Sequence, residues 1–534
     1  MEFEKFNFPG RRSNIVARNG LVATSQPLAA QAGLEVLQAG GNAVDAAIAT
    51  VATLCVVEPC STGLGGDAFA LIWMADEEKL VGINASGPAP QGLSADLIRE
   101  QGHHKMPALG PLAVTIPGSL RGWQLALERY GTMGLDSLLA RPIAYARDGY
   151  PVSQRIANAW ARSTEKMSVF PDSKRVWLPK GRAPRPAEIF HNLEFSRTLQ
   201  TIAHEGYDAF YAGQIGRQIA HSVQAAGGVL TEDDLKNYQA EWVQPISVDY
   251  HGYAFHEIPP NGQGLTALLA LNIAGGFDLK AMGYGTADYY HTLIEATKLA
   301  FADAQAYIAD PKQAAVPVAG LLSDSYTRQR QSLLSPHQAL PPQQGHPPRH
   351  GDTVYLTVAD GVGNMVSWIQ SLYMGFGSGL TAGTTGVQLQ NRGANFSLEP
   401  GHPNEAAPGK RPYQTIIPGF ITKDGRPFSS FGVMGGFMQP QGHLQVGLNL
   451  VDFGMDPQTA LDAPRFNWLG DMHVMLEATV AAELHQELTN RGHQLTPRDQ
   501  PMYFGGGQVI VRDPDSGVLI GGSEPRNDGS AVGF

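Results

Sequence analysis

The residue whose setting points most clearly to chemistry is Thr353. It follows a connector at about 334–352 that contains SPHQALPPQQGHPPRHGD, with five prolines and no apolar periodicity. From Thr353 on, apolar and polar side chains alternate as they do in a strand. If the peptide bond between Asp352 and Thr353 is cut, Thr353 gains a free α-amine beside its own hydroxyl. That amine can serve as the general base that a weak hydroxyl nucleophile needs.

A threonine at the start of a strand can also reflect β-propensity alone. The motifs of other hydrolase classes are the alternatives. A serine α/β-hydrolase needs a Gly-x-Ser-x-Gly elbow, and Ser378 in GFGSGL has Phe376 where the first glycine belongs. A metal hydrolase needs clustered His and carboxylate ligands, but the 16 histidines are scattered along the chain. The glycines before Asp67 lack the Gly-Lys-Ser/Thr ending of a phosphate loop. We therefore expect no cofactor and no metal.

The elements around Thr353 are expected to form a β-hairpin, with strands at 353–360 and 365–372 joined by the turn DGVGN. Upstream, two helices in tandem are expected over 20–57, capped by Ser25 and Asn42. The region 120–310 is largely helical in pattern, including a helix at 287–308. Further strands are expected near 384–390, 413–421 and 428–434, and helices near 440–462 and 475–491.

Length and composition narrow the class of protein. A chain of 534 residues is long enough for two domains or one multilayered sandwich. Its net charge of −11, without a basic stripe, argues against a nucleic-acid partner. The two cysteines, Cys55 and Cys60, are expected to be buried thiols rather than part of a disulfide framework. The N-terminus resembles no secretory signal and no apolar run is long enough to span a membrane, so we expect a cytoplasmic protein.

Several segments carry a resemblance to one family, the γ-glutamyltranspeptidases. The stretch GDTVYLTVADGVGNMVSWIQSLYMGFGSG looks like the processing site of that family. Similar segments occur in the family's order over roughly residues 20–530: ATSQPLAAQAGLEVLQAGGNAVDAAIA, GLGGDAF, HTLIEATKLAFADAQAYIADP, PGKRP, VMGG and DFGMDPQTALDAPRF. The chain is thus identified as a member of this family of N-terminal-nucleophile (Ntn) hydrolases.

The resemblance implies an α+β fold, an αββα sandwich of four layers. It also implies a precursor that cleaves itself between Asp352 and Thr353 into a large chain, 1–352, and a small chain, 353–534. These two chains would remain associated as a processed pair. In the family's pattern Thr353 is the nucleophile and Ser371, where the family has Thr, assists it. Gly435 and Gly436 would hold the oxyanion with their backbone N–H groups.

The expected substrate pocket departs from the family pattern. The Arg that pairs with a γ-glutamyl carboxylate corresponds to Asn84, and the Asp that binds the ammonium corresponds to Asn395. The remaining differences are Arg392 for a Gln, Tyr373 for an Asn, and Gln414 and Thr415 for paired serines. Losing the acid removes the charge that holds an ammonium group, while Arg392 makes the pocket more positive.

A compact carboxylate-bearing amide fits such a pocket better than an amino-acid head group does. The closest family members in this respect hydrolyse oxamate to oxalate and ammonia during purine-ring (uric acid) degradation. The alternatives are a γ-glutamyltranspeptidase or glutathione hydrolase, a cephalosporin-acylase-like amidase that accepts a bulkier acyl group, and an inactive binding homologue. In every enzyme reading the partner is a small-molecule amide, and neither nucleic acid nor a membrane is involved.

Overall fold

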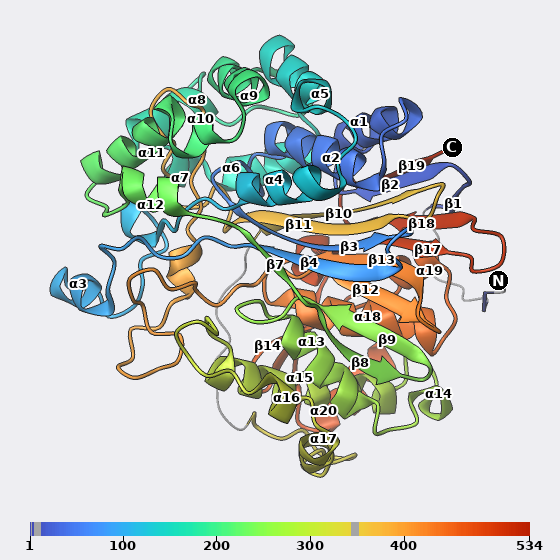
Figure 1. Ribbon diagram of the computed structural model, residues 1–534. Helices are drawn as coiled ribbons and strands as arrows, with labels where there is room; N and C mark the ends of the chain where they lie inside the picture. The colour runs from blue at the N-terminus through green and yellow to red at the C-terminus, as the bar shows by residue number, and fades with distance from the viewer. Residues whose placement is uncertain (2, 5–11, 343–351) are drawn as a thin grey trace.

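Two seven-stranded antiparallel sheets lie face to face at the centre of the molecule, and a layer of helices covers each outer face (Figure 1). The computed structural model describes residues 1, 3–4, 12–342 and 352–534. The first sheet, in spatial order, consists of β1 (Ile15–Ala17), β18 (Leu519–Ser523), β17 (Gly506–Arg512), β13 (Arg426–Met434), β12 (Gly419–Lys423), β9 (Tyr253–Glu257) and β8 (Ile246–Tyr250). The second consists of β19 (Ser530–Gly533), β2 (Gly20–Thr24), β10 (Asp352–Asp360), β11 (Met365–Tyr373), β3 (Asp67–Met74), β4 (Lys79–Ala85) and β7 (Glu241–Val243).

Apolar side chains from both sheets fill the space between them. Phe69, Tyr355 and Ile369 come from the second sheet, and Phe420 and Ile510 come from the first. All five are fully buried, as expected for two sheets that pack through their inner faces. The four-layer αββα sandwich expected from the sequence is confirmed.

Helices cover the outer face of each sheet, and further helices pack on the ones that contact the sheet. The layer on the second sheet contains α1 (Pro27–Gln38), α2 (Ala43–Val57), α4 (Ser119–Tyr130), α5 (Leu135–Asp148), α6 (Gln154–Arg162), α7 (Thr164–Met167), α8 (Pro171–Trp177), α9 (Leu193–Glu205), α10 (Asp208–Tyr211), α11 (Gln214–Ala225) and α12 (Glu232–Asn237). The other layer contains α13 (Gly264–Ala274), α14 (Leu279–Met282), α15 (Ala287–Tyr307), α16 (Val318–Leu321), α17 (Asp324–Gln331), α18 (Met438–Val451), α19 (Pro457–Asp462) and α20 (Ala482–Asn490).

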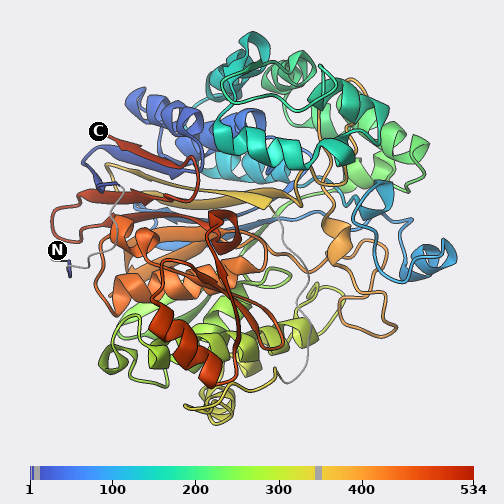
Figure 2. The ribbon, with the colours of Figure 1, turned by 180° about the vertical axis from the view of Figure 1, so that it is seen from behind.

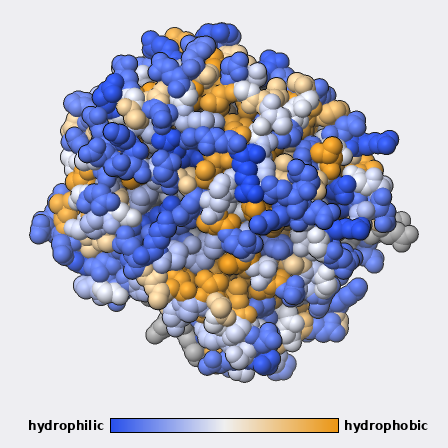
Figure 3. All heavy atoms as spheres, in the orientation of Figure 1, coloured by the Kyte–Doolittle hydropathy of each residue, from blue (hydrophilic) through white to orange (hydrophobic). Residues whose placement is uncertain are grey.

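Smaller elements complete the fold. Helix α3 (Ala95–Glu100) projects from one side (Figure 1). A short sheet of β14 (Phe466–Gly470), β15 (His473–Glu477) and β16 (Gln494–Arg498) lies with α20 over the second helical layer, as the reverse view shows (Figure 2). The two-stranded sheet pairs β5 (Tyr150–Pro151) with β6 (Ile189–Phe190). Hydrophilic side chains dominate the face seen in Figure 3, with apolar ones mainly near its middle. No helix in the described ranges combines the length and apolar character needed to cross a membrane.

The predicted hairpin is the centre of the second sheet. Strand β10 pairs with β11 on one side and with β2 on the other, while β11 also pairs with β3. Residues 353–360 and all of β11 are buried. Each large sheet combines strands from before and after position 353, so a cut at that position would leave the two chains sharing both sheets.

Several sequence predictions are confirmed at this level. Asn42 caps α2, where its side chain accepts hydrogen bonds from the N–H groups of Val44 and Asp45. Helix α15 covers almost the whole of the helix expected at 287–308. Cys55 and Cys60 are both buried free thiols.

Other sequence predictions were wrong. Residues 20–24 form strand β2, and α1 is capped by Gln26 rather than Ser25, whose hydroxyl donates to Glu58 instead. The segment 384–390 forms only isolated bridges, the strand expected at 413–421 is displaced to β12, and β15 occupies the start of the helix expected at 475–491. Strands β7, β8 and β9 were missed in the region with a helical pattern. For β7 and β9, pairing with strands that are distant in the sequence overrode the local helical pattern, and β8 pairs with β9.

The hydrogen bonds of Asp360 are expected to stabilise the hairpin. One carboxylate oxygen accepts hydrogen bonds from the N–H groups of Val362, Gly363 and Asn364, and the other accepts from the N–H of Ala43 at the start of α2. Asp360→Ala should lower the free energy of unfolding by about 2–4 kcal/mol, because it leaves buried donors without acceptors. Urea denaturation monitored by tryptophan fluorescence measures this change.

Asp515→Ala is the matched control, because Asp515 lies in the turn between β17 and β18 with an exposed side chain that makes no hydrogen bond with any described residue. It should change the free energy of unfolding by less than about 0.5 kcal/mol. Equal effects of the two substitutions would show that the contacts of Asp360 do not stabilise the hairpin.

Candidate active site

Thr353 lies at an irregularity in the central hairpin. The pairing of β10 with β11 shifts by one residue between positions 352 and 354, and such bulges redirect a side chain. The Thr353 side chain is buried, with 3% of its surface exposed. Its Oγ1 donates a hydrogen bond of 3.2 Å to Oγ of Ser371, and that oxygen accepts another of 2.7 Å from the N–H of Tyr373. The structure therefore pairs the two hydroxyls that the sequence singled out.

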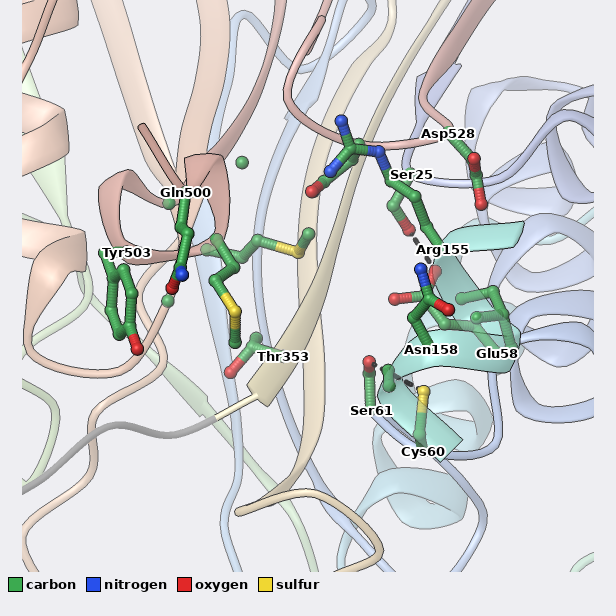
Figure 4. Close-up of a pocket in the computed structure, with 18 of the residues that line it drawn as sticks. Ser25, Glu58, Cys60, Ser61, Arg155, Asn158, Thr353, Gln500, Tyr503 and Asp528 are labelled. Atoms are coloured by element: carbon green, nitrogen blue, oxygen red, sulfur yellow. Dashed lines mark hydrogen bonds between the residues drawn. The ribbon is translucent and has the colours of Figure 1, made fainter. Parts of the chain in front are cut away.

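A cavity of about 750 Å³ opens beside Thr353 (Figure 4). One wall carries Ser25, Glu58, Cys60 and Ser61 together with Arg155 and Asn158 of α6. Gln500 and Tyr503 form the opposite wall. Thr353 lies between the two walls, at the N-terminal end of β10. A substrate in this cavity would therefore reach the Thr353 hydroxyl directly.

Gly435 and Gly436 form the turn between β13 and α18. Gly435 lines the same cavity as Thr353. The φ angles of the two residues are 131° and 61°, in the region that favours glycine. Their carbonyl oxygens accept hydrogen bonds from α18 residues, whereas neither N–H donates one to any residue that the structure describes. Two N–H groups near the start of a long helix suit a developing oxyanion.

Gln263 holds this turn in place. Its Nε2 donates to the carbonyl oxygen of Gly436 at 2.9 Å and also to that of Thr415, while its Oε1 accepts from the hydroxyl of Tyr413. Gln263 is fully buried. The glycine turn and the 413–415 segment are therefore fixed relative to one another.

Arg392 is the most unusual charge near Thr353. Its side chain is fully buried, and Nη1 donates to Oγ1 of Thr415 at 2.6 Å. The guanidinium carbon lies 4.5 Å from the centre of the Tyr373 ring, a cation–π contact. Tyr373 itself has φ of 80°, an unfavourable backbone conformation for a bulky residue. Nε and Nη2 of Arg392 have no hydrogen-bond partner among the described residues, so two donor nitrogens are left for a ligand.

The counter-charge of Arg392 is Asp67, the first residue of β3. Its Oδ2 lies 4.0 Å from Nε of Arg392. The carboxylate also accepts hydrogen bonds from the N–H of Gly87 and from the side-chain amides of Gln390 and Gln414. Burial nevertheless raises the pKa of Asp67 to about 6 and lowers that of Arg392 to about 10. At neutral pH both groups are charged.

The other expected substrate-binding residues differ in how they contact Arg392 and Asp67. Gln414 and Thr415 contact it as described, through Asp67 and Arg392. Asn395 follows Arg392 on the same short 3-10 helix, donates to the carbonyl of Tyr413 at 3.0 Å and leaves its own Oδ1 unpaired among the described residues. Asn84 bonds instead to Asn261 and to Ser86. The structure thus gathers Tyr373, Arg392, Gln414 and Thr415, with Asn395 beside them. Among the described residues, Asn84 makes no hydrogen bond to any of these five.

One group of side chains in the described ranges has a spacing that suits a metal ion: His291, Glu295 and His493. Nδ1 of His291 lies 2.8 Å from Nε2 of His493, and the ammonium of Lys298 lies 2.6 Å from the Glu295 carboxylate. The lysine thus already supplies the positive charge there. None of these residues lines the Thr353 cavity.

The sequence reading missed Asp67 and the α6 side chains. Asp67 ends the GLGGD segment and precedes an apolar strand, so a buried acid there was the available signal. The side chains of α6 gave none, because their place beside Thr353 depends on tertiary packing.

The fold and this arrangement of residues define the class of protein: an Ntn-hydrolase enzyme that acts on amides. The family model described as gamma-glutamyltranspeptidase matches residues 29–534. The chain belongs to the γ-glutamyltranspeptidase family, as the sequence resemblance indicated.

Individual relatives span the whole chain. The crystal structure of a cephalosporin acylase from Bacillus halodurans is 48% identical, has a TM-score of 0.95, and is aligned over 100% of this chain and 99% of its own. The glutathione hydrolase-like YwrD proenzyme of Bacillus subtilis is 36% identical over 98% of this chain and 99% of its own length. The oxamate amidohydrolase proenzyme of Klebsiella pneumoniae is 34% identical over 98% of this chain and 100% of its own length.

The Asp67 carboxyl gives a prediction about stability and pH. Because its pKa is raised from 3.8 to about 6 in the folded protein, its protonated form is the one that folding favours. Its contribution is fully present below pH 3.8 and is lost as pH rises to about 6. Asp67→Asn cannot ionise, so its stability relative to the wild type should rise by about 3 kcal/mol across that range.

Urea unfolding at pH values from 4 to 7 checks this prediction, and the difference between the two proteins cancels the titration of all other groups. A stability difference that stays constant with pH would contradict the raised pKa.

Proposed function

We propose that this protein is an N-terminal threonine amide hydrolase that activates itself by cutting its own chain before Thr353. In the first step Oγ1 of Thr353 attacks the carbonyl carbon of Asp352. The peptide nitrogen leaves as the α-amine of Thr353, and an ester to the threonine oxygen remains. Water hydrolyses that ester and releases the chains 1–352 and 353–534. The shared sheets support the proposal that both chains stay together.

Turnover then uses the same hydroxyl. The free α-amine accepts the hydroxyl proton as Oγ1 attacks the substrate amide carbon. Gly435 and Gly436 donate their N–H groups to the resulting oxyanion. The amine departs with a proton returned from the α-ammonium, and water hydrolyses the acyl ester. The observation that carries this proposal is the 3.2 Å hydrogen bond between Thr353 and Ser371 at the cavity that Gly435 also lines.

We further propose that the acyl group carries a carboxylate, which Arg392 binds. Two buried donor nitrogens without a partner among the described residues favour a planar anion, and a carboxylate could pair with both in a bidentate contact. The aromatic ring of Tyr373 limits the space near the guanidinium. Asn395 supplies no negative charge for a substrate ammonium. These features support oxamate as the smallest substrate of this kind, in line with the relationship to oxamate amidohydrolase.

The second candidate is an acylase for a longer dicarboxylic acyl group, such as glutaryl. The relationship to the cephalosporin acylase, which is 48% identical, supports this candidate. Hydrolysis of γ-glutamyl amides has less support, because it needs an acid for the α-ammonium. The cytoplasmic location expected from the sequence stays a prediction.

Variants of the two hydroxyls test the mechanism. Thr353→Ala should remain one uncut chain without activity, because no nucleophile is left, whereas Thr353→Ser should still be cut. Ser371→Ala should slow cleavage by about tenfold or more, since it removes the hydrogen bond that orients Thr353. Denaturing gels over time measure the cleavage, and efficient cutting of Thr353→Ala would contradict the assignment.

Arg392 is tested with pairs of substrates that differ in one charge. Oxamate and oxamide share a shape, but only oxamate has a carboxylate. Arg392→Ala should reduce kcat/KM for oxamate by about 100-fold, equivalent to about 3 kcal/mol for a buried charged hydrogen bond. The same substitution should change kcat/KM for oxamide by less than about threefold. Arg392→Lys, which keeps the charge without the bidentate geometry, should fall between them.

Glutaryl and γ-glutamyl anilides differ only in the α-ammonium and extend the same test. The wild type should prefer the glutaryl compound, because Asn395 cannot pair with the ammonium. A preference of the wild type for the γ-glutamyl compound, or equal losses of oxamate and oxamide hydrolysis in Arg392→Ala, would contradict the proposed acyl specificity.

A further inference from the structure

Helix α6 forms one wall of the cavity beside Thr353. Arg155, Asn158 and Arg162 all line the cavity. Their spacing of three and seven positions places them along one face of the helix. Two turns separate the two guanidinium-bearing residues, a rise of about 10 Å. Figure 4 shows Arg155 and Asn158 on the wall opposite Gln500 and Tyr503.

Both α6 arginines lack a hydrogen-bond or ion-pair partner among the described residues. Neither Arg155 nor Arg162 makes a hydrogen bond or ion pair with any residue in the described parts of the chain, although arginines nearby, such as Arg175 and Arg182, bind carboxylates. Both side chains belong to exposed residues. Their positive charges are therefore available to a molecule in the cavity.

The two acidic groups on the same wall, Glu58 and Asp528, form no ion pair with an α6 arginine in the described ranges. Glu58 accepts the hydroxyl hydrogen of Ser25, and Asp528 accepts that of Ser153. Asp499 lies in the segment that leads to Gln500 on the opposite wall. The two α6 guanidinium groups thus keep their donors for an anion that enters the cavity.

The position of Thr353 separates the two ends of a substrate. The acyl group extends toward Arg392 under the proposed function, and Arg392 is not among the residues that line the cavity. The α6 wall therefore faces the other end, the amine that leaves when the amide is cleaved. An oxamate molecule would not occupy this wall, because its leaving group is ammonia.

We propose that the α6 face is a subsite for the leaving amine, and that Arg155, assisted by Arg162, binds a carboxylate on that amine. The inference rests on Thr353 as the nucleophile of the proposed function. It makes amides whose two ends both carry carboxylates the best substrates, with Arg392 reading one end and α6 the other.

The test uses two glutaryl anilides, one that releases 4-aminobenzoate and one that releases its neutral analogue 4-aminobenzamide. The wild type should prefer the carboxylate compound. Arg155→Gln should reduce kcat/KM for that compound about tenfold, mainly through KM, because the contact is partly exposed to solvent. The same substitution should change kcat/KM for the neutral compound by less than about twofold. Arg162→Gln should show the same pattern more weakly.

Arg197→Gln is the matched control, because Arg197 is an exposed α9 residue whose side chain has no partner among the described residues and does not line the cavity. It removes the same charge and should leave kcat/KM unchanged for both substrates. Competitive inhibition by free 4-aminobenzoate against 4-aminobenzamide gives a second readout that needs no acyl group. Arg155→Gln should weaken only the inhibition by 4-aminobenzoate.

Equal effects of Arg155→Gln on both anilides, or none on either together with unchanged inhibition, would overturn the subsite. This failure is distinguishable from failure of the proposed function. The acyl specificity is measured with substrates that share one leaving group, and the role of Thr353 is measured by cleavage and activity of Thr353→Ala.

Discussion

A hydroxyl must be held still in a nearly dry interior, at a place that a substrate can reach. The structure meets this constraint by placing Thr353 at the register shift of the most buried hairpin of the fold. Strands β2 and β3 flank the hairpin, and Ser371 fixes the hydroxyl from the neighbouring strand. The glycine turn at 435–436 is held separately, through Gln263. The proposed nucleophile and the proposed oxyanion donors are thus positioned by different sheets that share one core.

The second constraint is a buried positive charge. Arg392 costs free energy to bury, and Asp67 offsets only part of that cost because it lies 4.0 Å away and has other donors to satisfy. The two donor nitrogens that remain without an acceptor in the described parts of the chain leave a place for an anion. Strain in the Tyr373 backbone, at the same place, is typical of a functional site. Under the two proposals, the donor nitrogens left without acceptors at Arg392 and the guanidinium groups of α6 are where a ligand with two anionic ends would be recognised.

The sequence predicted the parts of this arrangement that depend on local pattern or family resemblance. The hairpin after Thr353, the Asn42 cap and helix α15 follow from periodicity and capping. Strands β7, β8 and β9 did not, since their pairing partners lie far away in the chain. The resemblance placed Arg392 and Tyr373 in one pocket, and the structure brings the two side chains into contact. No local signal could have joined Asp67 to Arg392 or α6 to Thr353, because only the folded core brings them together.

The central claim is that the chain gains its catalytic amine by a cut directly before Thr353. N-terminal sequencing of the smaller chain of the purified, active wild-type protein tests it most directly. The account predicts a single new N-terminus that reads Thr-Val-Tyr-Leu, beginning at residue 353. An active protein that remains one intact polypeptide, or whose new N-terminus begins at another residue, would contradict it.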